Sequence, residues 1–184
     1  MGPATVNDTL FPLRLFSRHL AQKAGLKSRH PKLFFIGFNK TGTKTLHNFF
    51  RSNGYLSVHS SSYMAQRLGL PPIAKLIQQN EAKGRPLLDG LDHYDVYSDM
   101  IYLTDRELIE ANGLFRTFDA QNPGAYFVFN DRPVEKWVRS RLSHEGGPRG
   151  SFVGRYAKAM GIAEEEAPER WRQDYARHKA EVLT

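Results

Sequence analysis

The sequence of 184 residues contains no cysteine. This absence excludes disulfide-stapled scaffolds, zinc–thiolate sites and cysteine nucleophiles. The chain also lacks any apolar run that approaches the roughly 18 residues required by a membrane-spanning helix. Hydrophobic residues nevertheless make up 40% of the chain and aromatic residues 12%, which excludes a disordered protein. The length suits one domain and is too short for two of ordinary size.

Acidic residues are scarce in the first quarter of the chain. Residues 1–50 carry eight basic side chains and a single acidic one, Asp8, so the whole formal net charge of +7 lies there. The remaining residues are balanced in charge. An anionic partner is therefore expected near the N-terminal quarter. A nucleic acid, a membrane surface and a phosphorylated small molecule all fit this local positive field.

Residues 8–25 are predicted to form an amphipathic helix with a basic face. Its apolar positions recur at helical spacing: Leu10, Leu13, Phe16, Leu20 and Ala24. The broken apolar stretch and the lack of a small-residue cleavage site argue against a signal peptide. We interpret the segment as a packing helix with a solvated basic face, and a helix lying on a membrane surface is the alternative. We expect a basic helical arm over residues 1–30, an α/β domain over 31–184, and a cytoplasmic protein with peripheral membrane contact as the alternative.

A βαβ unit is predicted at the start of this domain. Residues 33–36 form a short apolar run that ends at Gly37, which is typical of a strand buried on both faces of a parallel sheet. A polar loop then leads into a predicted helix over 43–53 and a second strand over 55–58. This order predicts an α/β fold, with a parallel sheet flanked by helices in three layers.

Further elements are expected after this unit. The helix at 104 is predicted because Thr104 and Glu107 have the spacing of a capping box. In chain order, the expected elements are a helix from Pro71-Pro72 to near Gly84, a strand over 94–98, a helix from Thr104 to Asn112-Gly113, a strand over 125–129, a helix carrying Trp137 and Val138, and helices over most of the remainder.

The loop between the first strand and the first helix has the composition of a phosphate-binding loop. Backbone N–H groups at a helix start are unpaired and carry the positive end of the helix dipole. Gly37 and Gly42 have the spacing of a Walker A motif, but Thr43 stands where that motif has lysine. Lys44 is displaced by one residue, which rotates it about 100° around the helix. The loop therefore predicts anion binding without being a Walker A motif.

Residues 35–46, F-I-G-F-N-K-T-G-T-K-T-L, resemble the 5′-phosphosulfate loop of the sulfotransferase family. That family takes its sulfuryl group from 3′-phosphoadenosine 5′-phosphosulfate (PAPS), and its bacterial branch with G-F-N-K-T-G-T is especially similar. Lys44 departs from the pattern, where Thr or Ser is more usual. The resemblance implies a P-loop NTPase-like sulfotransferase fold and leaving-group stabilisation by Lys40. The donor-binding residues that it implies in this loop are Asn39, Lys40, Thr41, Gly42, Thr43, Lys44 and Thr45.

A second stretch resembles the other mark of the family, an arginine followed eight residues later by a serine. Arg132 and Ser140 have this spacing, within a segment similar to R-D-P-x-x-W-x-x-S. Pro133 directly follows Arg132, where the family more often has one residue between them. The planar fork of arginine suits a phosphate, and Ser140 lies about two helical turns further on the same side. The resemblance implies that both residues bind the 3′-phosphate, and it covers about residues 31–145.

The general base is not fixed by the resemblance, because the family uses His, Glu or Asp at a position that varies between branches. Asp99 is the first candidate, because it follows a predicted strand in a segment that resembles the acidic segment of the bacterial branch. His59 is the second and His47 the third. For each of them, a structural hydrogen-bonded role is an equal alternative. The sequence has no His-rich ligand spacing, so we expect no metal site.

The leading interpretation is a sulfotransferase that moves a sulfuryl group from PAPS to a hydroxyl or amine, leaving adenosine 3′,5′-bisphosphate (PAP). A small molecule, a lipid and a carbohydrate remain open as the acceptor. A P-loop kinase or NTPase is the runner-up, and a basic nucleic-acid-binding domain without enzymatic activity is a further alternative that leaves the loop unexplained. The family normally has further strand and loop elements after about residue 151, so we expect a C-terminally short member.

Overall fold

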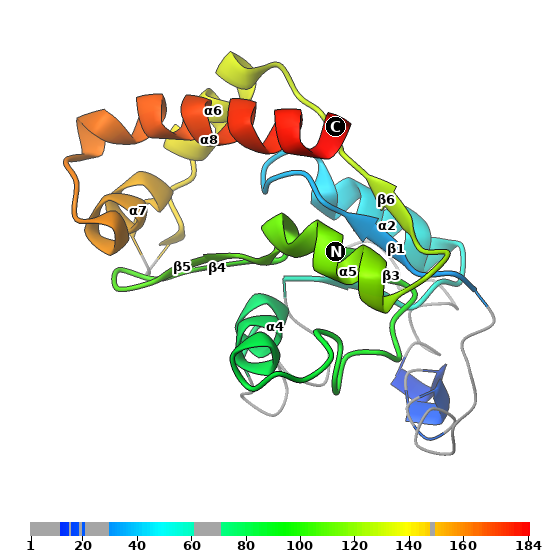
Figure 1. Cartoon of the computed structure of the whole chain (residues 1–184). Helices are drawn as coiled ribbons and strands as arrows, with labels where there is room; N and C mark the ends of the chain where they lie inside the picture. The colour runs from blue at the N-terminus through cyan, green and yellow to red at the C-terminus, as the bar shows by residue number, and fades with distance from the viewer. Residues whose placement is uncertain (1–11, 15, 19, 21–29, 61–70, 148–149) are drawn as a thin grey trace.

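The computed structural model describes residues 12–14, 16–18, 20, 30–60, 71–147 and 150–184 (Figure 1). Its centre is a four-stranded parallel sheet in the order β2-β3-β1-β6. The strands are β1 (Leu33–Phe35), β2 (Ser57–His59), β3 (Val96–Ser98) and β6 (Tyr126–Val128). β1 pairs with β3 on one side and with β6 on the other. This architecture confirms the predicted α/β fold with a parallel sheet flanked by helices.

Helices cover both faces of the sheet because successive residues of β1 point to opposite sides. Phe34 stacks on Phe118 of α5 (Phe115–Gln121), with ring centroids 4.7 Å apart. The ring of the next residue, Phe35, packs beside that of Phe50 in α2 (Thr43–Ser52), with ring centroids 5.9 Å apart. Figure 1 shows α5 and α2 on opposite faces of the sheet. The three layers follow directly from this alternation.

The helix predicted after Pro71-Pro72 is α4 (Ile73–Ala82). Ile73 and Ile77 are fully buried and join Phe34 in the main hydrophobic core. The predicted strands over 94–98 and 125–129 correspond to β3 and β6. The second strand lies over 57–59, slightly later than predicted.

The helix predicted from Thr104 is wrong, because this segment is a β-hairpin. β4 (Ile101–Leu103) pairs antiparallel with β5 (Leu108–Glu110), and the 3₁₀ helix η1 (Ala111–Leu114) follows. The Thr104 hydroxyl accepts a hydrogen bond from the Glu107 N–H at 3.1 Å, as a helix cap would. The Thr104 N–H in turn donates to the Glu107 carbonyl at 2.9 Å and closes the turn. The same side-chain bond that starts a helix elsewhere therefore serves a hairpin here.

The C-terminal part is helical, as predicted. It consists of α6 (Val134–Leu142), α7 (Phe152–Met160), the 3₁₀ helix η3 (Glu164–Glu166) and α8 (Ala167–Leu183), and Figure 1 shows α8 running beside α6. These helices enclose a second core with many aromatic side chains. Trp137 and Trp171 are fully buried in it. Phe38 of the loop after β1 belongs to this core, so the helices pack directly on the predicted phosphate-binding loop.

The described part of the N-terminal helix comprises residues 12–14, 16–18 and 20. Arg18 forms an ion pair with the buried Asp95 at 2.8 Å, so this arginine faces the domain rather than solvent. Three of the predicted apolar positions are exposed instead: Leu13, Phe16 and Leu20. The other two, Leu10 and Ala24, lie outside the described residues. Nowhere in the described chain is a helix both long and apolar enough to cross a membrane.

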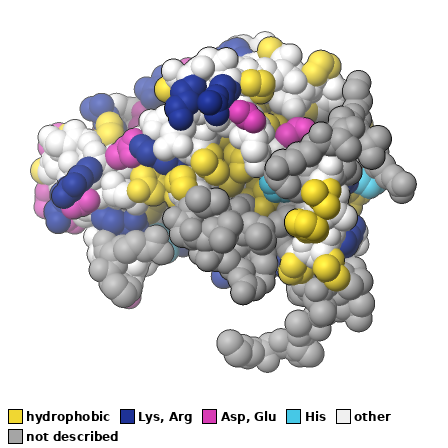
Figure 2. Space-filling view, turned by 90° about the horizontal axis from the view of Figure 1, so that it is seen from below, with side chains coloured by type: hydrophobic (Ala, Val, Ile, Leu, Met, Phe, Trp, Pro, Cys, Tyr) yellow, Lys and Arg dark blue, Asp and Glu magenta, His cyan; other side chains and the backbone are white. Residues whose placement is uncertain are grey.

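One face of the molecule mixes both signs of charge. Seen from below, Lys and Arg side chains lie beside Asp and Glu side chains, with hydrophobic side chains between them (Figure 2).

Candidate active site

The loop after β1 presents a row of backbone donors in front of α2. Lys40 and Gly42 both adopt positive φ, at 65° and 91°. Gly42 precedes α2 as its N-cap, and no side chain caps the helix. Among the described residues, none supplies an acceptor to the backbone N–H groups of residues 40–44. Unpaired donors at a helix start are the standard device for binding a phosphate or a sulfate.

Side chains from the segment after β6 hold this loop in place. The carbonyl oxygens of the three successive loop residues 39–41 accept hydrogen bonds. Their donors are Trp137 Nε1 (2.8 Å), Arg132 Nη1 and Asn130 Nδ2 (3.3 Å). Because the C=O and N–H of a peptide unit point in opposite directions, these bonds turn the N–H groups of the following residues away from the three donor side chains. The loop is thereby shaped as a cradle for an anion.

Arg132 lies against the loop, as the two-part sequence signature requires. Its backbone is fixed by Tyr175 of α8, whose hydroxyl oxygen lies 2.9 Å from the Arg132 nitrogen and 3.0 Å from its carbonyl oxygen. Its guanidinium reaches the Lys40 carbonyl. Ser140 lies two helical turns along α6, and its hydroxyl makes no hydrogen bond to any described residue. The Arg132 guanidinium thus lies against the loop, and Ser140 lies on the helix α6 that follows Arg132.

The two first-ranked candidates for the base meet at the carboxyl ends of neighbouring strands. Asp99 follows β3 with a φ of 54°, and His59 is the last residue of β2. The His59 Nε2 lies 3.6 Å from Asp99 Oδ2 and 3.1 Å from the hydroxyl of Thr43. The third candidate, His47, contacts Ser57 Oγ through Nδ1 at 2.8 Å. Asp99 and His59 therefore adjoin the start of α2.

Burial shifts the pKa values of this pair in opposite directions. Burial raises the pKa of Asp99, although His59, Arg141 and Lys40 favour the carboxylate. Burial lowers the pKa of His59, and the nearby Asp99 opposes that shift. The lowered pKa of His59 favours its neutral imidazole, and the raised pKa of Asp99 favours its neutral carboxyl. The buried Asp99 Oδ1 has no hydrogen-bond partner among the described residues, so it can accept a proton or a hydrogen bond from a ligand.

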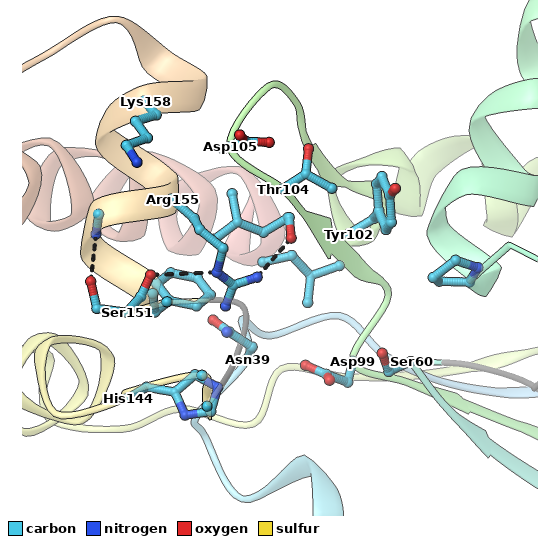
Figure 3. A pocket seen from close by; sticks show the side chains of 18 of the residues that line it. Asn39, Ser60, Asp99, Tyr102, Thr104, Asp105, His144, Ser151, Arg155 and Lys158 are labelled. Atoms are coloured by element: carbon cyan, nitrogen blue, oxygen red, sulfur yellow. Dashed lines mark hydrogen bonds between the residues drawn. The ribbon is translucent and has the colours of Figure 1, made fainter.

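A cavity of about 1080 Å³ opens next to Asp99 and the loop. Figure 3 shows Asn39, Asp99 and Ser60 on one side of it and Lys158 and Asp105 on the other. The far wall is formed by the β4–β5 hairpin and α7. Arg155 of α7 joins these two elements, because its Nη1 donates to the Leu103 carbonyl at 2.8 Å. Because the sequence predicts a helix from Thr104 instead of this hairpin, it does not predict that the hairpin lines the cavity.

Sequence reasoning also missed Arg141, which directly follows Ser140 in α6. Its Nε donates to Asn39 Oδ1 at 2.9 Å, and its Nη2 donates to Glu110 Oε1 at 2.7 Å. The contact with Asn39 joins residues 102 positions apart in the chain. The only available signal was a second arginine one turn after Trp137, which does not distinguish a buried residue from a solvated one.

Asn39 is therefore held through two groups, its carbonyl oxygen by Trp137 and its side-chain oxygen by Arg141. The remaining loop residues of the prediction, Thr41, Gly42, Thr43, Lys44 and Thr45, follow it into the first turn of α2. Lys44 and Thr45 are exposed there.

Across the described ranges, no group of three or more His, Cys, Asp or Glu residues could hold a metal ion.

Comparison with known families agrees with this geometry. A family model described as a sulfotransferase domain matches residues 32–184, which is most of the chain. Comparison with curated proteins gives no match, and neither does comparison with solved structures. The matched range includes the loop after β1, the Asp99–His59 pair and the Arg132–Ser140 segment. The chain belongs to the sulfotransferase domain family.

Proposed function

We propose that this protein transfers a sulfuryl group from PAPS to a hydroxyl or amine acceptor. The observation that carries the proposal is the loop of residues 39–45. The backbone N–H groups of residues 40–44 have no acceptor among the described residues, the carbonyl oxygens of residues 39–41 accept hydrogen bonds from side chains, and Arg132 lies directly against the loop. Two anion-binding elements side by side suit a donor that carries phosphate at two ends.

In this proposal, the 5′-phosphosulfate lies in the cradle before α2, with the N–H groups of residues 40–44 and the hydroxyls of Thr43 and Thr45 as donors. The 3′-phosphate lies between the guanidinium of Arg132 and the hydroxyl of Ser140. The Ser140 hydroxyl makes no hydrogen bond to a described residue, and the Arg132 backbone is held by Tyr175. Both groups are half-buried, which strengthens their hydrogen bonds to an anion.

The acceptor is proposed to enter the cavity between the loop, the hairpin and α7. Its hydroxyl or amine donates a proton to Asp99 and attacks the sulfur atom, while the bond from sulfur to the bridging phosphate oxygen breaks. Negative charge then develops on the leaving phosphate of adenosine 3′,5′-bisphosphate. Lys40 neutralises that charge, and an interaction that strengthens in this way lowers the barrier. His59, neutral beside Asp99, orients the carboxylate.

Binding measurements separate this proposal from a kinase or NTPase. We expect adenosine 3′,5′-bisphosphate to bind in calorimetric titrations with the same affinity in the presence of Mg²⁺ and of EDTA. ATP with Mg²⁺ should bind more weakly, because the loop lacks a Walker lysine and ATP has no 3′-phosphate for Arg132. Tighter binding of ATP–Mg²⁺ than of the bisphosphate would contradict the proposal and favour a nucleoside-triphosphate enzyme.

A further inference from the structure

A buried arginine lies between the donor loop and the wall of the acceptor cavity. Arg141 is only 1% exposed. Its Nε donates to Asn39 in the loop of residues 39–45, and its Nη2 donates to Glu110 at the end of β5. Asn39 lies in the loop that follows β1 of the four-stranded sheet, whereas Glu110 ends β5 of the two-stranded sheet, so Arg141 bridges two parts of the fold that make no strand pairing with each other.

The surroundings of Arg141 are aromatic on several sides. Its guanidinium carbon lies 4.2 Å from the ring centroid of Trp137, 5.0 Å from that of Phe152, 5.3 Å from that of Trp171 and 5.4 Å from that of Phe38. Arginine remains protonated in proteins, so a full charge is enclosed in the helical core. Buried ion pairs are often no more stable than apolar replacements of similar size. Stability alone therefore does not account for an arginine at this position.

The contact with Asn39 acts on the geometry of the loop. Asn39 is almost fully buried, and α6 holds both its carbonyl and its side chain. The next residue, Lys40, adopts a φ of 65°, a left-handed conformation that a residue with a side chain seldom takes without support. Fixing Asn39 therefore fixes the direction in which the Lys40 side chain and the following N–H groups leave the turn.

We propose that Arg141 is a positioning residue, which holds Asn39 so that Lys40 and the loop donors face the 5′ end of the donor. This role rests on the proposed function, because it assumes that the loop binds the phosphosulfate. Arg141 does not touch the donor itself: its Nε and Nη2 are committed to Asn39 and Glu110. On the loop it acts by holding Asn39 in place rather than through its charge.

Substitution of Arg141 by Lys and by Met tests whether Arg141 supports donor binding by holding Asn39 or by its positive charge. Lysine keeps the charge but cannot donate to both partners in the fork geometry of arginine. We expect both variants to weaken binding of adenosine 3′,5′-bisphosphate by about tenfold or more, measured by calorimetry. The surface variant Arg172→Met is the matched control, because that arginine also pairs with a glutamate, Glu135, but far from the loop in sequence and exposed. It should bind like wild type. Full binding by Arg141→Lys would show that charge alone suffices and would overturn the proposal.

A double-mutant cycle with Asn39 measures whether the two substitutions weaken bisphosphate binding through one shared effect. A general loss of stability at Arg141 would not produce this coupling. If Arg141 acts through Asn39, Asn39→Ala should weaken binding about as much as Arg141→Met, and the double variant should be no weaker than either single variant by more than about twofold. Additive losses would overturn the proposal.

If Arg141→Met does not fold, as judged by thermal unfolding without ligand, the cycle is run with Arg141→Lys and is read in the same way. If wild type itself fails to bind the bisphosphate, the proposed function fails, whereas wild-type binding with unaffected variants overturns only the role of Arg141.

Discussion

The parallel sheet and the C-terminal helices are built on different principles, although both border the loop of residues 39–45. The main core beside the sheet is made of apolar side chains such as Phe34, Val58 and Ile77. The core of the helices encloses the charged Arg141 within a group of aromatic rings. A core of the first kind supplies stability through buried area. The second kind also places hydrogen-bond donors on the loop at defined positions.

This difference predicts a division of roles across the site. Lys40 and Asp99 follow strands of the sheet, and we assign them to the chemical step. Arg132 precedes α6 and is held by Tyr175 of α8, Ser140 lies within α6, and we assign both to donor binding on this helical side. Substitutions on the sheet side should therefore reduce turnover more than affinity, whereas substitutions on the helical side should reduce affinity. Each prediction below tests one side of this division.

The largest effect is expected for Asp99→Asn. Removing a general base typically costs about 10²- to 10⁴-fold in rate, and the isosteric amide should leave PAP affinity unchanged. Sulfuryl transfer should be followed with labelled PAPS, with Asp119→Asn on the exposed surface of α5 as the control. For wild type, the rate should rise with pH through a pKa higher than that of an ordinary aspartate, because burial raises the pKa of Asp99. A rate that Asp99→Asn leaves unchanged would remove Asp99 from the chemistry.

The same raised pKa has a consequence for stability. Between the unfolded and the folded pKa of Asp99, the folded protein binds more protons than the unfolded chain, so its contribution to stability falls as pH rises. At neutral pH, Asp99→Asn should therefore be more stable than wild type, with the difference shrinking at low pH. Thermal unfolding of both proteins at several pH values measures this difference in stability. An Asp99→Asn variant less stable than wild type at pH 7 would contradict a raised pKa of Asp99.

The next largest effect is expected for Lys40→Ala. Loss of a donor to a developing charge typically costs about 10²- to 10³-fold in turnover. Affinity for PAP should change much less, because the charge of Lys40 matters most when the leaving phosphate gains charge. Turnover and calorimetric affinity should be measured on the same preparation. Equal losses in both quantities would show that Lys40 contributes ground-state binding only.

On the helical side, Arg132→Ala should weaken PAP binding about 10- to 100-fold, which corresponds to one or two charge-assisted hydrogen bonds. Arg132→Lys should recover only part of the loss, because a point charge cannot reproduce the planar fork. Arg177→Ala is a suitable control, since Arg177 pairs with Asp174 on the exposed side of α8. Affinity of Arg132→Ala equal to that of wild type would remove Arg132 from the donor site.

The smallest effect is expected for Lys44→Ala, which sharpens the contrast within the loop. Lys44 is exposed on the first turn of α2, where a charge is worth a few tenths to about 1 kcal/mol, or about two- to fivefold in affinity. Turnover at saturating donor should stay close to wild type. If Lys44→Ala abolished turnover while Lys40→Ala did little, Lys44 would behave as a displaced Walker lysine and a kinase activity would be favoured.

The sequence allowed prediction of those features that depend on neighbours in the chain. The apolar run before Gly37 and the polar loop after it predict β1 and the start of α2, because strand, turn and helix start each have local signals. The hairpin was missed for the same reason. Thr104 and Glu107 satisfy a local capping pattern, and only packing of the hairpin beneath α7 decides between helix and turn.

The contacts that shape the site could not be predicted in this way. Arg141 reaches Asn39 across 102 residues, and Trp137 reaches the same residue across 98. Nothing in the spacing of α6 distinguishes Arg141, which is buried, from the exposed Arg139 two residues earlier. The meeting of Asp99 and His59 is an intermediate case. His59 ends β2 and Asp99 follows β3. A parallel sheet brings the carboxyl ends of its strands to one edge, so the sequence implied that both residues lie at that edge, but it did not give the distance between them.

The most direct test of the account compares the affinities of adenosine 3′,5′-bisphosphate and 5′-AMP in the absence of Mg²⁺. The two ligands share the 5′ end that the loop is proposed to hold, and they differ in the 3′-phosphate proposed for Arg132 and Ser140. We predict that the bisphosphate binds about 10- to 100-fold more tightly by calorimetry. Equal affinities would show that the second anion site does not exist and would contradict the account.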